Sequence, residues 1–222
     1  MRLFTEIYAL ACERHGGTSA VEDMLPCPLS DKQLKATTDD RFLANMSRRV
    51  FQAGLKHEMV NEKWPAFELA FRRFDPLYCS MLSDDDIDQF MRSAEIIRHL
   101  NKIRSVRHNA AYLRERSLEH KGYGAFISQW PADDVVGLWW ELKKHAKQLG
   151  GFSGAAFLRM VGKDTFLLTT DVIKGLQMEG VLQKAPTSKK DSELANLAFL
   201  QWRQESKRSL CQISKILALS LV

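Results

Sequence analysis

Apolar residues recur at a helical period along the whole chain, and this pattern limits the fold more than any other feature. Alternation of apolar and polar residues never extends convincingly beyond four positions, so no segment is typical of a half-buried β-strand. Apolar stripes with helical spacing occupy segments such as 42–50, 103–113 and 210–221. No repeat of fixed period is visible, which disfavours a solenoid. The sequence therefore predicts an all-α protein of about ten short helices in an irregular bundle.

Prolines and capping residues mark where several helices begin. Trp64-Pro65 and Asp75-Pro76 put proline in a first helical turn, where its missing N–H is tolerated. Ser83 followed by three acidic residues resembles a capping box, and Thr169-Thr170-Asp171 indicates another helix start. A longer helix is expected from about residue 100 to 118.

Composition narrows the class of protein further. Apolar residues make up 45% of the 222 residues, which is enough for a core, and no apolar run approaches the ~20 residues of a membrane span. The first six residues carry an acid and no small-residue cleavage site, so they are not typical of a secretory signal. We therefore expect a cytoplasmic protein that does not contact a membrane.

Cysteine usage gives no indication of a metal centre. Cys12, Cys27, Cys79 and Cys211 are scattered without a C-x-x-C pair, and free thiols are expected in a reducing compartment. His15 lies three residues after Cys12, but no matching pair of zinc ligands follows downstream. We expect neither a bound metal nor any other cofactor.

The charge balance suits a polyanionic partner. The net charge is +5, and the pI is near 9.0. The alternative is an ordinary solvated surface, because 27 acidic residues offset the cations. The basic residues that cluster along the chain are Arg48, Arg49, Arg72, Arg73, Arg98, Lys102, Arg104, Arg107, Lys143, Lys144, Lys147, Lys163 and Lys174.

Residues 149–154, which we call the glycine turn, end one helix and start another. Glycine lets the backbone approach a partner closely and adopt positive φ, and the exposed N–H groups at the second helix start can hold a phosphate. Such contacts grip DNA without reading its sequence. A Gly-Gly pair is also a common helix C-cap, so both interpretations stay open. The candidate phosphate-binding residues are Gly150, Gly151, Phe152, Ser153 and Gly154.

An acid follows at the next predicted helix start. Asp171 lies twenty residues after Gly151, where the helix dipole favours an ionised carboxylate. A carboxylate there could stabilise the positive sugar that develops as a glycosidic bond breaks, and orient the attacking water. The alternative is an ordinary first-turn acid paired with Lys174.

Two stretches resemble known DNA glycosylases. A glycine turn followed by an acid resembles the helix-hairpin-helix superfamily of DNA glycosylases, and residues 170–174 are similar to the catalytic stretch of its alkylbase members. Independently, residues 42–116 resemble the type I 3-methyladenine DNA glycosylases. The matching residues of that segment are Phe51-Gln52-Ala53-Gly54-Leu55, Phe74-Asp75-Pro76, Ile96-Ile97-Arg98-His99, Lys102-Ile103 and Asn109-Ala110-Ala111-Tyr112-Leu113.

The resemblance implies an all-α, helix-hairpin-helix glycosylase-like fold with two helical subdomains and a cleft between them. We expect an N-terminal helix and loop over 1–29, a subdomain with base pocket and wedge over 30–130, and a helix-hairpin-helix subdomain over 131–222. The implied function is hydrolysis of the glycosidic bond of a damaged, 3-methyladenine-like base in duplex DNA during base excision repair. No lysine is obviously placed to attack the sugar, so we expect a monofunctional enzyme, acting as a monomer.

The resemblance also implies site residues. Residues 52–55, which we call the wedge loop, would meet the DNA, with Gly54 and Leu55 filling the gap left by an extruded base. The base pocket would hold Arg49, Phe51, Gln52 and His57. Arg49 stands where the family has an acid that reads the base, and His57 stands where it has a stacking aromatic. The family's paired Cys and His zinc ligands are missing as well. The alternative to a wedge role is that Leu55 is buried in the core, and the alternative to stacking is that His57 lies on the surface.

The arginine bears on both substrate and activity. The positive charge of Arg49 would disfavour binding of a positively charged base. Asp171 is the natural replacement for the carboxylate that is missing at position 49. A DNA-binding module of the same fold with catalysis lost is therefore the second hypothesis, favoured by Arg49 and opposed by Asp171. A third, a helical protein-interaction domain, predicts binding that is insensitive to salt, whereas phosphate-driven binding weakens steeply as salt rises.

Overall fold

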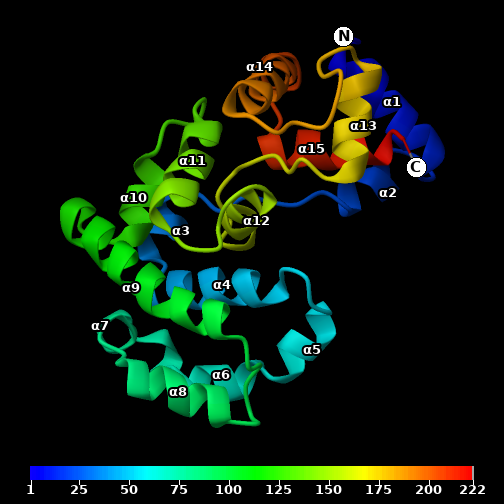
Figure 1. The fold of residues 1–222 in the computed structure, drawn as a ribbon. Coiled ribbons are helices and arrows are strands. Elements are labelled where there is room, and N and C mark those ends of the chain that lie inside the picture. The colour runs from blue at the N-terminus through cyan, green and yellow to red at the C-terminus, as the bar shows by residue number, and fades with distance from the viewer. Residues whose placement is uncertain (222) are drawn as a thin grey trace. The chain divides into compact units, whose positions relative to one another are not determined.

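The computed structural model describes residues 1–221, and every regular element among them is a helix (Figure 1). This confirms the predicted all-α class. In chain order the helices are α1 (Phe4–Arg14), α2 (Thr18–Asp23), α3 (Asp31–Ala36), α4 (Asp39–Gln52), α5 (His57–Glu62), α6 (Trp64–Ala70), the 3-10 segment η1 (Arg72–Phe74), α7 (Pro76–Ser80), α8 (Asp84–Arg92), α9 (Leu100–His120), α10 (Tyr123–Gln129), α11 (Val135–His145), α12 (Phe152–Met160), α13 (Thr170–Met178), α14 (Lys189–Ser206) and α15 (Leu210–Leu219).

These helices form two compact units. Unit 1 contains residues 1–29, 131–140 and 162–222, and unit 2 contains residues 30–130 and 141–161. The glycine turn therefore belongs to unit 2 and Asp171 to unit 1.

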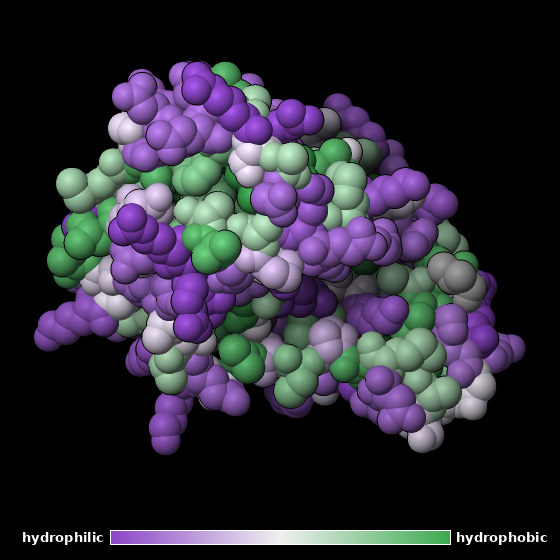
Figure 2. Space-filling view, turned by 90° about the horizontal axis from the view of Figure 1, so that it is seen from below, coloured by the Kyte–Doolittle hydropathy of each residue, from purple (hydrophilic) through white to green (hydrophobic). Residues whose placement is uncertain are grey.

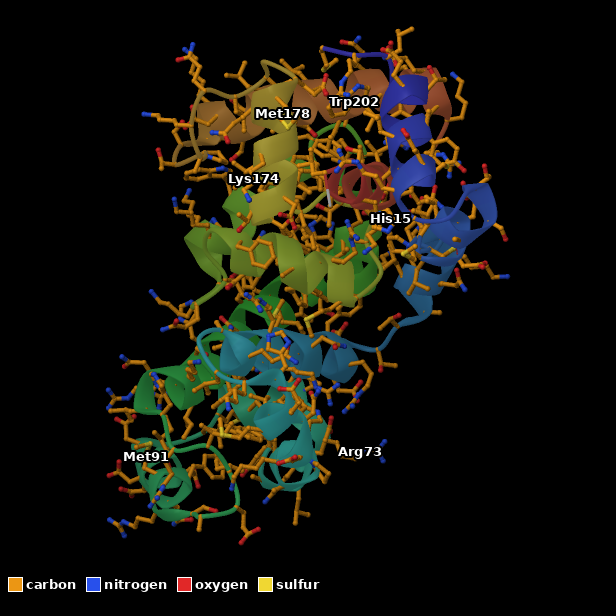
Figure 3. All side chains as sticks on the ribbon, turned by 90° about the vertical axis from the view of Figure 1, so that its right-hand side faces the viewer. His15, Arg73, Met91, Lys174, Met178 and Trp202 are labelled. Atoms are coloured by element: carbon orange, nitrogen blue, oxygen red, sulfur yellow. The ribbon has the colours of Figure 1, made fainter. Side chains whose placement is uncertain are left out.

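Unit 1 is held together by aromatic and aliphatic side chains from both ends of the chain. Phe166 stacks on Phe199 with ring centroids 4.2 Å apart, and Trp139 meets Phe166 edge-on. Trp202 is fully buried, and its indole N–H donates to the carbonyl of Arg2 (3.2 Å; Trp202 is labelled in Figure 3). Burial of such large rings supplies most of the hydrophobic stabilisation of a small unit.

Unit 2 has an aromatic core of its own. Trp64 stacks on Phe67 and Phe74, and Phe51 packs edge-on against Phe67 at 4.5 Å. The guanidinium of Arg48 lies 4.4 Å from the Trp64 ring centroid, so a cation covers one face of this core. The α4 helix contributes to the core and ends at the wedge loop, so core packing fixes where that loop begins.

Local capping follows the punctuation of the sequence. Ser83 accepts from the N–H of Asp86, whose carboxylate accepts in return from the N–H of Ser83, as the predicted capping box requires. Pro65 and Pro76 lie in the first turns of α6 and α7. The predicted long helix is confirmed as α9, of 21 residues.

The number of helices is larger than expected, because several are short. Helices α2 and α3 have six residues each, and α10 begins directly after Gly122 in a stretch whose glycines indicate a loop. A single turn or two of helix carries too few apolar residues to produce a recognisable period. Tertiary packing, rather than propensity, stabilises helices of this length.

On the face seen in Figure 2, hydrophilic and hydrophobic residues are interspersed. None of the described helices is long and apolar enough to cross a membrane. Within residues 1–221 no cluster of three potential metal ligands occurs. The cysteines are free thiols, two of them buried.

Candidate nucleic-acid interface

The wedge loop is anchored at the end of α4 by a buried lysine. The Nζ of Lys102, on α9, donates to the carbonyls of Ala53 (2.6 Å) and Phe51 (3.2 Å). Burial lowers the pKa of Lys102, and the nearby charge of Arg49 lowers it further. Gly54 has a φ of +76° and is exposed, and Leu55 beside it is half-buried. Leu55 therefore has neither a core position nor full exposure, and the loop that carries it is fixed at its base.

Arg49 connects the last turn of α4 to the first turn of α12. Its guanidinium carbon lies 5.3 Å from the ring centroid of Phe152, and its Nη2 is 3.5 Å from the hydroxyl of Ser153. No carboxylate pairs with it within the described residues, and its Nε is buried without a partner. Burial lowers the pKa of Arg49, so the charge is held at a cost in desolvation. This position is therefore cationic, whereas the family that the sequence resembles has an acid there.

The other predicted pocket residues differ in exposure. Phe51 is completely buried against Phe67 and belongs to the core of unit 2. Gln52 is 9% exposed, at the end of α4. His57 is exposed at the first position of α5. Gln52 and Arg49 thus lie within one helical turn of each other, and His57 begins the next helix.

The glycine turn joins α11 to α12 and is fixed from behind by Asn109. The side-chain amide of this fully buried residue donates to the carbonyl of Lys147 (3.1 Å), and its oxygen accepts from the N–H of Lys147 (2.7 Å). A Cβ at Gly154 would lie 2.8 Å from the carbonyl oxygen of Leu149, so the turn closes tightly on the helix that follows. Gly151 has a φ of +56°, a left-handed conformation that favours glycine.

The outer side of the glycine turn presents free backbone donors. Gly150, Gly151 and Phe152 are exposed. In the part of the chain that the structure describes, the N–H groups of Gly151 and Phe152 have no backbone acceptor. They lie at the start of α12, whose nine residues give it a positive N-terminal end. These N–H groups can therefore bind an anion by donating hydrogen bonds to it.

Asp171 lies in unit 1, at the second residue of α13. Thr169 caps this helix by accepting from the N–H of Val172 (3.3 Å). The Asp171 side chain is half-buried and makes no hydrogen bond or ion pair within residues 1–221. Lys174, labelled in Figure 3, is exposed and does not pair with it. The first-turn ion pair considered from the sequence is therefore not formed.

Unit 2 brings together the wedge loop, Arg49 and the glycine turn. Two residues of this assembly carry roles that the sequence did not predict. Lys102 caps α4, and Asn109 clamps the glycine turn. Both lie within the stretches that resemble the type I glycosylases, and a polar residue inside an apolar helical stripe was the available signal.

Comparison with known proteins agrees with this architecture. The family model of methyladenine glycosylases matches residues 34–148, more than half of the chain. The matched segment includes the wedge loop and α9, and the fold is all-α, as in the DNA glycosylases of this class. The chain belongs to the methyladenine glycosylase family. The match stops just before the glycine turn and does not include Asp171.

Individual relatives are more distant. The DNA-3-methyladenine glycosylase 1 of Escherichia coli (strain K12) is 36% identical over 64 residues, which are 28% of this chain and 34% of that protein. The chain thus matches about a third of the length of this curated relative. The 3-methyladenine DNA glycosylase I from Staphylococcus aureus superposes with a TM-score of 0.52 at 20% identity, covering 69% of this chain and 92% of its own.

A variant of 3-methyladenine DNA glycosylase I in complex with 3-methyladenine gives a TM-score of 0.51, also at 20% identity, over 64% of this chain and 84% of its own. At such identities the likeness is one of fold.

Proposed function

We propose that the protein is a monofunctional DNA N-glycosylase of base excision repair, which hydrolyses the glycosidic bond of a damaged, alkylated base. Membership of the methyladenine glycosylase family supports the reaction class. The observation that carries the proposal is the contact of Arg49 with Phe152 and Ser153, because it fixes the helix of the wedge loop beside the exposed glycine turn. A DNA strand held at one element is then within reach of the other.

In the proposed mechanism the N–H groups of the glycine turn first anchor a phosphate of the damaged strand. The damaged base is then extruded, and Leu55 fills the space that it leaves in the stack. A half-buried leucine on an anchored loop suits this role, since it keeps an apolar tip accessible while its base is fixed. Arg49, Gln52 and His57 contact the extruded base, and Phe51 supports them from the core.

Asp171 is the proposed catalytic carboxylate. Its position in the first turn of α13 and the absence of a competing ion pair within residues 1–221 leave its carboxylate available. It stabilises the positive charge that develops on the sugar as the bond to the base breaks, and it orients the water that attacks C1′. The proton of this water passes to solvent or to the departing base, and no covalent enzyme intermediate forms.

Arg49 narrows the proposed substrate. A guanidinium that is half-buried and lacks an acidic partner disfavours a second positive charge beside it. Among alkylated bases, those that are uncharged in DNA therefore suit this protein better than cationic ones. The partner is damaged duplex DNA, and monomeric assembly and a cytoplasmic location remain predictions.

The decisive experiment compares the wild type with Asp171→Asn on alkylated duplex DNA. We expect the wild type to release base, and the variant to release it at least a hundredfold more slowly while binding DNA equally well. Lys174→Gln, on the exposed side of the same helix, is the matched control and should retain activity. Release by Asp171→Asn at the wild-type rate would rule out the catalytic role of this residue.

A DNA-binding module without catalysis is the second candidate, and the cation at position 49 is the observation that favours it. In that case both the wild type and Asp171→Asn bind DNA, and neither releases a base. The same pair of proteins therefore separates the two functions.

A further inference from the structure

Unit 2 contains a surface hollow that the proposed site does not use. Its volume is about 580 Å³. One wall is a stripe of α9 that includes Asn101, Arg104, Ser105 and His108, whose spacing puts them on one helical face. Lys147 and Gln148, the two residues that lead into the glycine turn, also line the hollow. We call this hollow the basic groove.

The charge of the basic groove is positive and uncompensated. Arg104 and Lys147 are exposed, and neither makes an ion pair within residues 1–221. Arg107, which also lines the groove, is held by Asp84 and by the carbonyl of Leu82. No carboxylate lines the groove. Two exposed cations therefore line it without an acidic partner among the described residues.

The lining also indicates which kind of anion fits. No Phe, Tyr or Trp side chain lines the groove, and its one ring, the imidazole of His108, is hydrogen-bonded to the carbonyl of His145, so the groove offers little surface on which a base could stack. The remaining lining groups are mostly hydroxyls and amides, with a single apolar side chain, Ala111. A sugar-phosphate backbone needs cations and hydrogen-bond donors and no stacking surface. A free nucleotide would leave its base without a partner.

We propose that the basic groove binds the phosphate backbone of DNA, as a continuation of the phosphate site at the glycine turn. This inference rests on the proposed function, because it assigns a second contact to the same DNA. Lys147 lines the groove two residues before the glycine turn, and Asn109 fixes its backbone. The stripe from Asn101 to His108 is about 10 Å long, enough for about two phosphates of one strand.

The test is the salt dependence of binding to an undamaged and an abasic duplex. The double variant Arg104→Gln/Lys147→Gln should bind about tenfold more weakly at moderate salt, and its slope of log affinity against log salt should fall by about two. Because the two side chains are exposed, the melting temperature should not change. Arg92→Gln/Lys32→Gln is the matched control, since it removes the same charge from exposed positions of unit 2 outside the groove.

The outcomes separate the inference from the proposed function. Base release at saturating DNA should be unchanged in the groove variant, with only the KM raised. A slope equal to that of the control variant would overturn the groove as a phosphate site while leaving glycosylase activity intact. A wild type that neither binds DNA nor releases base would reject the proposed function, and the groove with it.

Discussion

The two units use their charged residues differently. In unit 1, ion pairs join distant parts of the chain: Arg2 contacts Glu179, and Arg208 contacts Glu22, both at 2.5 Å. In unit 2, Arg49 and Lys147 have no acidic partner within residues 1–221, although other arginines of the same unit do. Both units thus contain ion pairs, and the difference lies in Arg49 and Lys147, which both border the glycine turn and have no acidic partner among the described residues. Under the proposed function these two cations are available to an external anion.

The largest expected effect concerns the glycine turn of unit 2. Gly154→Ala should lower the free energy of unfolding by about 1–3 kcal/mol and weaken DNA binding, because the added Cβ would meet the carbonyl of Leu149 at 2.8 Å. Chemical denaturation and DNA titration measure the two effects. In Gly150→Ala the Cβ has ordinary contact only, 3.5 Å from Lys143, so this control should stay within about 0.5 kcal/mol of wild type. Equal behaviour of the two variants would contradict the tight closure.

The second prediction tests the ion pairing of unit 1 through pH. Burial, the largest influence, raises the pKa of Glu179, but the hydrogen bonds from Arg2 outweigh it, and the folded pKa lies below the usual 4.5. The carboxylate therefore stabilises the fold above pH 4.5, and this stability is lost as pH falls through the folded pKa. Glu179→Gln should cost about 1–3 kcal/mol at pH 7 and much less at pH 3. A difference that persists unchanged in acid would show that packing, and not charge, matters there.

The third prediction concerns the wedge loop. Leu55→Ala should slow base release about tenfold, equivalent to ~1.4 kcal/mol, because the space beside the extruded base stays unfilled. Single-turnover base release is the measurement. Leu69→Ala, which truncates a leucine of unit 2 that is 83% exposed, should behave like wild type. If the two variants release base equally fast, Leu55 is not the wedge.

The smallest expected effect tests the role of Arg49, a cation on α4 that has no acidic partner in the described part of the chain. Arg49→Gln should raise the release of a cationic alkylated base roughly fivefold relative to an uncharged one, since it removes a unit charge from the proposed base pocket. A competition assay on DNA that carries both lesions measures this ratio. Arg48→Gln removes the neighbouring arginine, which covers Trp64, and should leave the ratio unchanged.

Local features were predictable from the sequence, and long-range contacts were not. The Ser83 capping box, the prolines of α6 and α7 and the extent of α9 each depend on a few adjacent residues. By contrast, Arg49 and Ser153 are 104 residues apart, and Asn109 and Lys147 are 38 residues apart. A single sequence carries no signal for such pairs. The candidate site was therefore predicted as separate segments, and the structure adds the contacts that join those in unit 2.

Exposure was the other quantity that the pattern left open. Leu55 and Phe51 are both apolar and four positions apart, yet Phe51 is completely buried and Leu55 only partly. The helix ends at Gln52, Ala53 is extended and Gly54 has a positive φ, so Leu55 lies outside the helix that buries Phe51. Because glycine adopts such a conformation in many turns without function, its presence alone does not separate the two side chains.

The ammonium group of Lys102 bears on the selectivity of the proposed base extrusion. By satisfying the carbonyls of Phe51 and Ala53, it immobilises the root of the wedge loop during folding, before any nucleic acid arrives. Under the proposed function, a loop whose root is already fixed loses less conformational entropy on insertion, so more of the interaction energy remains to discriminate a weakened base pair from an intact one.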